Sequence, residues 1–240
     1  MSTSLDIAQL KLTSATVELR YDKAYIIWDR AGFFWSEISL NWPDSKINQV
    51  EPNISRFIIN DRFDLMLSLD RSHIIDLKPT SSLKEFTEYA SIFLNLVMES
   101  LNISKLTRIG FRLVYNKYFP DKNRAADTLV STKMMVVPQG KIFNIQGKVV
   151  QPKYSLTWEG ESTAAKVTLF TREKKIEITV PPGVEDVHSI NITKYELIYD
   201  IDYYTISPVS RGQFNVKDWI EQAYQLIKRD SKFFMDLGNA

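Results

Sequence analysis

The chain contains no cysteine, and only eight glycines and two histidines occur among its 240 residues. The absence of cysteine excludes disulfides, thiol nucleophiles, thiolate zinc sites and iron–sulfur clusters. With so few glycines a phosphate-cradling loop is not expected, and neither a GxxxxGK[ST] nor a GxGxxG string occurs. The sequence therefore predicts no cofactor.

An excess of one charge and a long apolar run are missing as well. Thirty Lys and Arg face 29 Asp and Glu, which leaves a net charge of +1, so we expect no bulk attraction to generic nucleic acid or to anionic lipid. No stretch approaches the roughly 18 apolar residues of a membrane span, and residues 1–10 lack the pattern of a secretory signal. We therefore expect a cytoplasmic protein with no membrane partner.

What the chain does have is enough apolar residues for a substantial core. Hydrophobic residues make up 44% of the sequence and aromatic residues 12%, which excludes a disordered tail. The length fits one large domain or two small, closely packed ones.

The first half shows alternating strand patterns followed by a helical pattern. Residues 15–30 predict a hairpin that turns at Asp22-Lys23, and 63–77 predict a second hairpin that turns at Asp70-Arg71. The segment between them, 31–60, contains Trp35, Trp42, Pro43 and Pro52 and favours a short helix or an irregular cover.

A helix is predicted next, from Ser82 to Leu101, with Ser82 and Glu85 at capping-box spacing. Its apolar residues repeat at intervals of three and four, and a strand over 105–118 follows. Strand, strand, helix, strand is the order of an α+β unit in which a helix covers an antiparallel sheet.

The second half is mostly β in pattern and ends in a helix. Residues 120–127 are polar and predict a linker or exposed loop. Strands are predicted over 132–137, 141–150, 153–158, 164–171, 174–180 and 194–207, with turns at 138–140, 159–160 and 181–183. The last helix is predicted over 215–234, with Asn215 as its N-cap.

The predicted fold class is therefore α+β, with antiparallel sheets that are each covered by an amphipathic helix. An N-terminal half (1–120) and a C-terminal half (121–240) each carry an aspartate-bearing strand that leads through a polar joint into a helix. Two interpretations stay open: the halves are diverged copies, or they form one continuous domain. Two copies would pair their sheets edge to edge or pack helix against helix.

Several strings resemble an uncharacterised, sporadically distributed family of prokaryotic proteins that is defined by an automated sequence model. They are ATVELRY from residue 15, LSLDRSHIIDLK from residue 67 with the helix and strand that follow, and ELIYDIDYY from residue 196 with the last helix. The Arg108-x-Gly110-x-Arg112 motif is the part most similar to the family pattern. The resemblance implies a single α+β protein without an established activity, and its patchy distribution implies mobile or defence-type gene neighbourhoods.

The residues offer few candidates for catalysis. His73 lies in a predicted strand and His188 in a loop, and neither is near a nucleophile-elbow string, so both are interpreted as structural. Asp200 and Asp202 share one strand face and would together suit Mg²⁺ or Mn²⁺. No phosphate-binding loop accompanies them, so a solvated face or ion pairs are favoured over a metal site.

Two further sets are candidates for binding. Arg108 and Arg112 share one strand face, where they would bind a phosphate or carboxylate, or form ion pairs with aspartates such as Asp200 and Asp202. Phe33, Phe34 and Trp35 are consecutive, so at least one of them should be exposed or cover another element. Exposed aromatics often mark partner contacts, with packing under the 31–60 segment as the alternative, so Phe34 and Trp35 complete the candidate surface.

These observations lead to three hypotheses. The favoured one is a non-enzymatic accessory protein that binds itself or another protein. The second is a nucleic-acid or nucleotide-sensing factor that uses Arg108 and Arg112. The third is a metal-dependent phosphoryl-transfer enzyme that uses Asp200 and Asp202.

Overall fold

The structure is a computed structural model that describes residues 5–80, 82–132, 134–135, 141, 143–178 and 190–239. The strands are β1 (Lys11–Tyr21), β2 (Lys46–Glu51), β3 (Ile54–Ile59), β4 (Phe63–Ser68), β5 (Arg71–Asp76), β6 (Lys105–Phe119), β7 (Lys153–Glu159), β8 (Thr163–Ile178), β9 (Ile190–Thr205) and β10 (Val209–Ser210). The helices are α1 (Ile27–Asn41), α2 (Lys84–Ser100), α3 (Lys122–Val130) and α4 (Val216–Asn239), with 3₁₀ turns η1 (Ile7–Gln9) and η2 (Arg211–Gln213).

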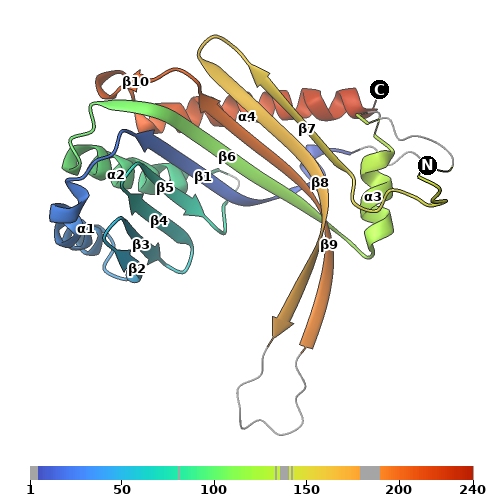
Figure 1. The fold of residues 1–240 in the computed structure, drawn as a ribbon, viewed down its shortest axis with the longest axis horizontal. Coiled ribbons are helices and arrows are strands. Elements are labelled where there is room, and N and C mark those ends of the chain that lie inside the picture. Colours follow the sequence, from blue (N-terminus) through green and yellow to red (C-terminus); the bar gives the residue numbers. More distant parts are fainter. Residues whose placement is uncertain are drawn as a thin grey trace, which may run out of the picture.

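The strands form one antiparallel sheet, and the fold class is α+β as predicted. The strand order is β2-β3-β4-β5-β1-β6-β9-β8-β7, and β10 pairs with β6. The two halves of the chain meet edge to edge where β6 pairs with β9, from Phe119–Tyr195 to Gly110–Tyr204. Helices α2 and α4 are also in contact, so the two arrangements considered for the halves occur together (Figure 1). Whether the halves are diverged copies stays a prediction.

One cross-strand row of side chains explains where the core lies. Following the register, Phe57, Leu65, Ile74, Val17, Phe111, Tyr203, Ala165 and Trp158 are successive partners across the sheet. Residues in one such row share a face of the sheet. Trp35 of α1, Phe86 of α2 and Trp219 of α4 each stack on a member of this row, with ring centroids 5.5–6.5 Å apart. These three helices therefore cover the same face, which we call the helix face. We call the other face, which carries Arg108 and Arg112, the open face. Glu196 and Ile198 of β9 lie on it but are buried, and α3 contacts β6, β8 and β9.

The helices that the apolar periodicity predicts are confirmed. Asn215 accepts hydrogen bonds from the backbone N–H groups of Lys217 (2.9 Å) and Asp218 (3.2 Å) and caps α4 as predicted. The prediction of a capping box at α2 is wrong. Leu83, with φ of 50°, precedes the helix, and Glu85 binds Arg62 instead of reaching back to the cap.

Two local predictions fail because tertiary pairing and capping decide the structure. The hairpin over 15–30 is wrong, since β1 pairs with β5 and β6 while its expected partner begins α1. The linker over 120–127 is wrong as well. Asp121 accepts hydrogen bonds from the N–H groups of Asn123 and Arg124, both at 2.9 Å, and starts α3, whose Ala125 and Leu129 are buried.

The remaining strand predictions are confirmed in part. The hairpin of β4 and β5 and strands β6 and β7 lie where they are predicted, whereas β2 and β3 are strands that the 31–60 prediction lacks. The predicted strand 164–171 and the described part of 174–180, up to Ile178, form one continuous β8. The described residues within 141–150 and within 132–137 form no strand. Residues 133, 136–140, 181–183 and His188 lie outside the described residues.

Strands β8 and β9 extend beyond the body of the sheet as a two-stranded arm (Figure 1). The pairing of β7 with β8 ends at Lys153–Phe170, and that of β6 with β9 ends at Phe119–Tyr195, while β8 and β9 continue to pair as far as Ile178–Ile190. None of the helices in the described part of the chain is long and apolar enough to cross a membrane.

Candidate functional site

The structure brings the four charged candidates together on the open face. Arg112 pairs in register with Asp202 across β6 and β9, and Val114 pairs with Asp200. Gly110 lies between the two arginines, opposite Glu18 of β1 on one side and Tyr204 of β9 on the other. Strand periodicity predicts the shared face, but it does not predict that β1, β6 and β9 are neighbours.

Each arginine of this network binds carboxylates. Arg112 forms a two-pronged contact with Asp200, from Nε to Oδ1 at 2.7 Å and from Nη2 to Oδ2 at 2.6 Å. Arg108 bridges two strands, because its Nη1 lies 3.1 Å from Glu18 Oε1 and its Nη2 lies 2.7 Å from Asp202 Oδ2. Two-pronged guanidinium–carboxylate contacts fix geometry as well as charge. The ion-pair interpretation of this cluster is therefore the one that the geometry matches.

Gly110 makes room for the guanidinium of Arg108. A Cβ atom at position 110 would lie 2.5 Å from Arg108 Nη1. The ring of Tyr204 covers the same group, with its centroid 4.4 Å from Cζ. Gly110 is thus needed for close approach, and Tyr204 and Glu18 complete a setting for Arg108 that the sequence patterns miss.

The pKa shifts of Arg112 and Asp202 reflect their ion pairs and their burial. The hydrogen bond to Asp200 raises the pKa of Arg112 above its ordinary value. Burial raises the pKa of Asp202, and the positive charges of Arg108 and Arg112 offset that effect only in part. Asp200 and Asp202 thus serve as arginine partners. No group of three or more His, Asp or Glu side chains arranged to hold a metal ion occurs within the described ranges.

The two aromatic candidates differ in exposure. The prediction that Phe34 belongs to an exposed surface is wrong, because Phe34 is 0% exposed and belongs to the core beneath α1. Trp35 is half-buried and stacks on Phe57 with ring centroids 6.0 Å apart. Phe33 is the exposed member of the run, at 41%, so the prediction that one of the three lies outside the core is confirmed.

Further exposed apolar residues lie on α1 and β2, the elements around Phe33 in the sequence. Tyr25, Trp28, Phe33 and Leu40 on or next to α1 and Ile47 and Val50 on β2 are all exposed, from 41% for Phe33 to 75% for Leu40. We call these six residues the α1 patch. The helical period of about 100° per residue places Trp28, Phe33 and Leu40 on the outer half of α1, away from Phe34 and Ile38. That period is visible in the sequence, but the inner and outer halves cannot be distinguished without knowing what α1 covers.

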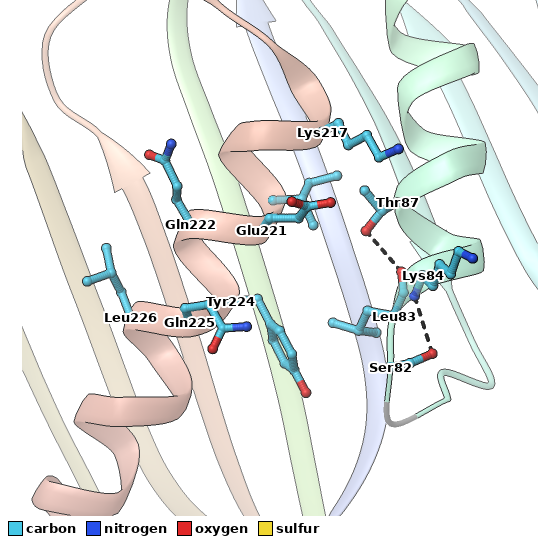
Figure 2. Close-up of a pocket in the computed structure, with 11 residues that line it drawn as sticks. Ser82, Leu83, Lys84, Thr87, Lys217, Glu221, Gln222, Tyr224, Gln225 and Leu226 are labelled. Atoms are coloured by element: carbon cyan, nitrogen blue, oxygen red, sulfur yellow. Dashed lines mark hydrogen bonds between the residues drawn. The ribbon is translucent and has the colours of Figure 1, made fainter.

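Two hollows flank α4. Figure 2 shows the first, a groove of about 790 Å³ between α2 and α4, towards which Lys217 and Tyr224 point from α4. Polar residues such as Lys84, Thr87 and Glu221 line it together with apolar ones such as Leu83 and Ile220. The second is an apolar cavity of about 480 Å³ between α4 and β7–β9, with Trp158, Tyr203, Phe233 and Phe234 in its lining.

The apolar cavity contains one internal polar contact. The Tyr199 hydroxyl donates to Ser231 Oγ at 3.1 Å, and burial raises the pKa of Tyr199 to about 12. The phenol is therefore uncharged at neutral pH and serves as a hydrogen-bond donor within the cavity. No histidine is among the described residues that line either hollow.

Comparison of the chain with protein-family models, with curated proteins and with solved structures gave no match. The resemblance to the sporadic prokaryotic family therefore stays a prediction, and function is argued from the geometry above.

Proposed function

We propose that the protein acts in the cytoplasm as a non-enzymatic accessory factor that binds another protein through the α1 patch. The observation that carries this proposal is the concentration of six exposed large apolar side chains within residues 25–50. Exposed large apolar side chains concentrated on one helix and one edge strand are typical of partner contacts, and Trp and Tyr are common anchors of such contacts.

The charges around the patch indicate the chemistry of the partner. Residues 22–51 contain five acidic side chains and three basic ones. Lys46 is paired with Asp61 and Arg30 lies over the ring of Phe33, whereas Asp29 and Glu51 are exposed without an ion pair within the described residues. A partner surface with apolar pockets and a basic rim would complement this arrangement.

The two alternatives have less support from the geometry. A nucleotide-sensing site would need free guanidinium groups, and those of Arg108 and Arg112 bind three carboxylates between them. A metal-dependent transferase would need Asp200 and Asp202 to bind the ion, and both instead face arginines at 2.6–2.7 Å.

Site-specific photo-crosslinking tests the proposal in the native cell. A photoreactive phenylalanine derivative replaces Phe33 of the α1 patch, and the matched control replaces Tyr118, an exposed aromatic residue of β6. We expect a single heavier protein adduct from position 33 and none from position 118. Equal adducts from both positions, or none from position 33, would contradict the proposal.

A further inference from the structure

The sheet ends at β7, and this edge is unusually regular. β7 is the last strand in the sheet order, and all seven of its residues pair with β8 without a shift in register. The opposite edge strand, β2, has a register shift between Ile47 and Gln49. Bulges protect strand edges from further pairing, so β7 is the edge that is open to another strand.

The hydrogen-bond pattern shows which backbone groups of β7 point outward. The N–H of Gly160 donates to the carbonyl of Thr163 at 2.9 Å, and that of Thr171 donates to the carbonyl of Pro152 at 3.3 Å. Hydrogen-bonded pairs alternate along an antiparallel ladder. The even-numbered residues of β7 therefore bond to β8, and Lys153, Ser155, Thr157 and Glu159 direct their N–H and C=O groups away from the sheet.

We propose that two copies of the chain pair through their β7 edges, antiparallel and centred on Leu156. This is the register in which every residue of β7 has a partner. Ser155 and Thr157 of opposite copies then exchange the outward hydrogen bonds, as do Lys153 and Glu159. The sheet becomes continuous across a two-fold axis, with the same surface used by both copies.

The side chains of β7 are self-complementary in this register. Lys153 of each copy lies opposite Glu159 of the other, and within the described residues neither side chain has an ion pair of its own. Tyr154 lies opposite Trp158, and Leu156 lies opposite itself. Opposite charges and aromatic pairs directly across strands are the favourable combinations in antiparallel ladders.

Apolar side chains at the β7 edge are exposed and would be covered by a second copy. Tyr154, Leu156 and Trp158 lie on the helix face, in register with Leu169, Val167 and Ala165 of β8. Phe234 of α4 contacts the rings of Tyr154 and Trp158, with centroid distances of 6.2 and 5.8 Å, yet Trp158 stays 47% exposed and Phe233 64%. The two-fold pairing puts the helix faces of both copies on one side, where these exposed rings would be covered.

The β7 pairing does not involve the α1 patch, but it determines where the two α1 patches of a dimer lie. β7 and β2 are the opposite edges of the sheet, so a dimer through β7 keeps both α1 patches outermost. Such a dimer would present two identical partner surfaces, which increases the avidity for a multivalent partner.

Charge reversal at β7 tests the proposal by mass. Sedimentation equilibrium of the full chain, at up to about 100 µM, is expected to give twice the 27.8 kDa of one chain. Lys153→Glu and Glu159→Lys each place like charges opposite one another at both ends, so each should weaken dimerisation by about tenfold or more. Mixing the two variants restores both opposite-charge pairs and should restore the dimer.

Two more variants separate this pairing from other modes of association. Thr157→Pro removes an outward N–H without touching the bonds to β8 and should abolish the dimer, whereas Glu161→Lys, in the turn beyond β7, should leave it intact. A monomeric wild type, a dimer unaffected by Thr157→Pro, or variants that do not recombine on mixing would each overturn the proposal. A dimer lost only in Trp28→Ala would also overturn it and would assign self-association to the α1 patch.

Discussion

At the scale of single residues, the open face is held by compensation between charges. Arg108 is the centre of the network, because it contacts Glu18 of β1, Asp202 of β9 and the ring of Tyr204 while lying over Gly110. Removing one partner of such a set leaves the others uncompensated. The role of each residue therefore depends on its neighbours across the strands.

Gly110→Ala tests this setting with the smallest possible change. The added methyl group would displace the guanidinium of Arg108 at the flexible end of its side chain, so the free energy of unfolding should fall by up to about 1 kcal/mol, the contribution of a partly exposed ion pair. The matched control is Gly32→Ala, where a Cβ meets no atom within 4 Å in the exposed face of α1. That change should raise stability by up to about 1 kcal/mol, since Ala is the better helix former. Equal effects of the two substitutions in urea unfolding would refute the close-approach role.

His73 gives the open face a pH dependence. Burial lowers the pKa of His73 below 6.5, and its Nε2 has no hydrogen-bond partner. The unfolded chain therefore takes up the proton first as the pH falls. Stability should be fully present above pH 6.5 and decline below it, until the lower pKa of the folded state is reached.

His73→Gln should remove this decline. The measurement is the urea midpoint of wild type and variant across the pH range below 6.5. Because carboxylates also titrate at low pH, the difference between the two proteins is the quantity to compare. A constant difference across the range would show that His73 does not contribute.

At the scale of elements, regular patterns predicted the structure and mixed patterns did not. Helices α2 and α4 have long apolar repeats, and β4–β6 alternate cleanly, so their positions follow from the sequence. The short helix that is one of the two interpretations of 31–60 is present as α1, but it begins at Ile27, within the predicted hairpin. α3 does not follow from apolar periodicity, because the cap of a single aspartate, Asp121, starts it. Similarly, the shared face of Arg108 and Arg112 was predictable, whereas the position of Glu18 beside them depends on β1 pairing with β6.

Phe93→Ala tests the element that the sequence predicts best. Phe93 lies on the buried side of α2 and is 0% exposed. Its truncation should therefore lower the free energy of unfolding by about 3–5 kcal/mol. The control is Ile92→Ala, at a neighbouring position of α2 that is 43% exposed, which should cost much less. An unchanged urea midpoint in Phe93→Ala would contradict the placement of α2.

At the scale of the whole molecule, one sheet places the two proposed contact surfaces at opposite edges. The core lies on the helix face and the arginine–carboxylate network on the open face. The α1 patch includes residues of the edge strand β2, and the exposed Trp158 belongs to the edge strand β7. Net charge and short motifs do not show which residues lie at these edges and faces, so they carry little information about binding. The features that suggest binding depend on edges and faces that appear only after the chain has folded.

Calorimetric titration with the protein crosslinked from position 33 is the most direct test of whether the α1 patch binds a protein partner. Wild type and Trp28→Ala are compared, with Tyr118→Ala as the control. We expect Trp28→Ala to weaken binding by about 30-fold, the loss of about 2 kcal/mol that defines an interface anchor, and Tyr118→Ala to bind as wild type does. An unchanged Kd in Trp28→Ala would contradict binding through the α1 patch.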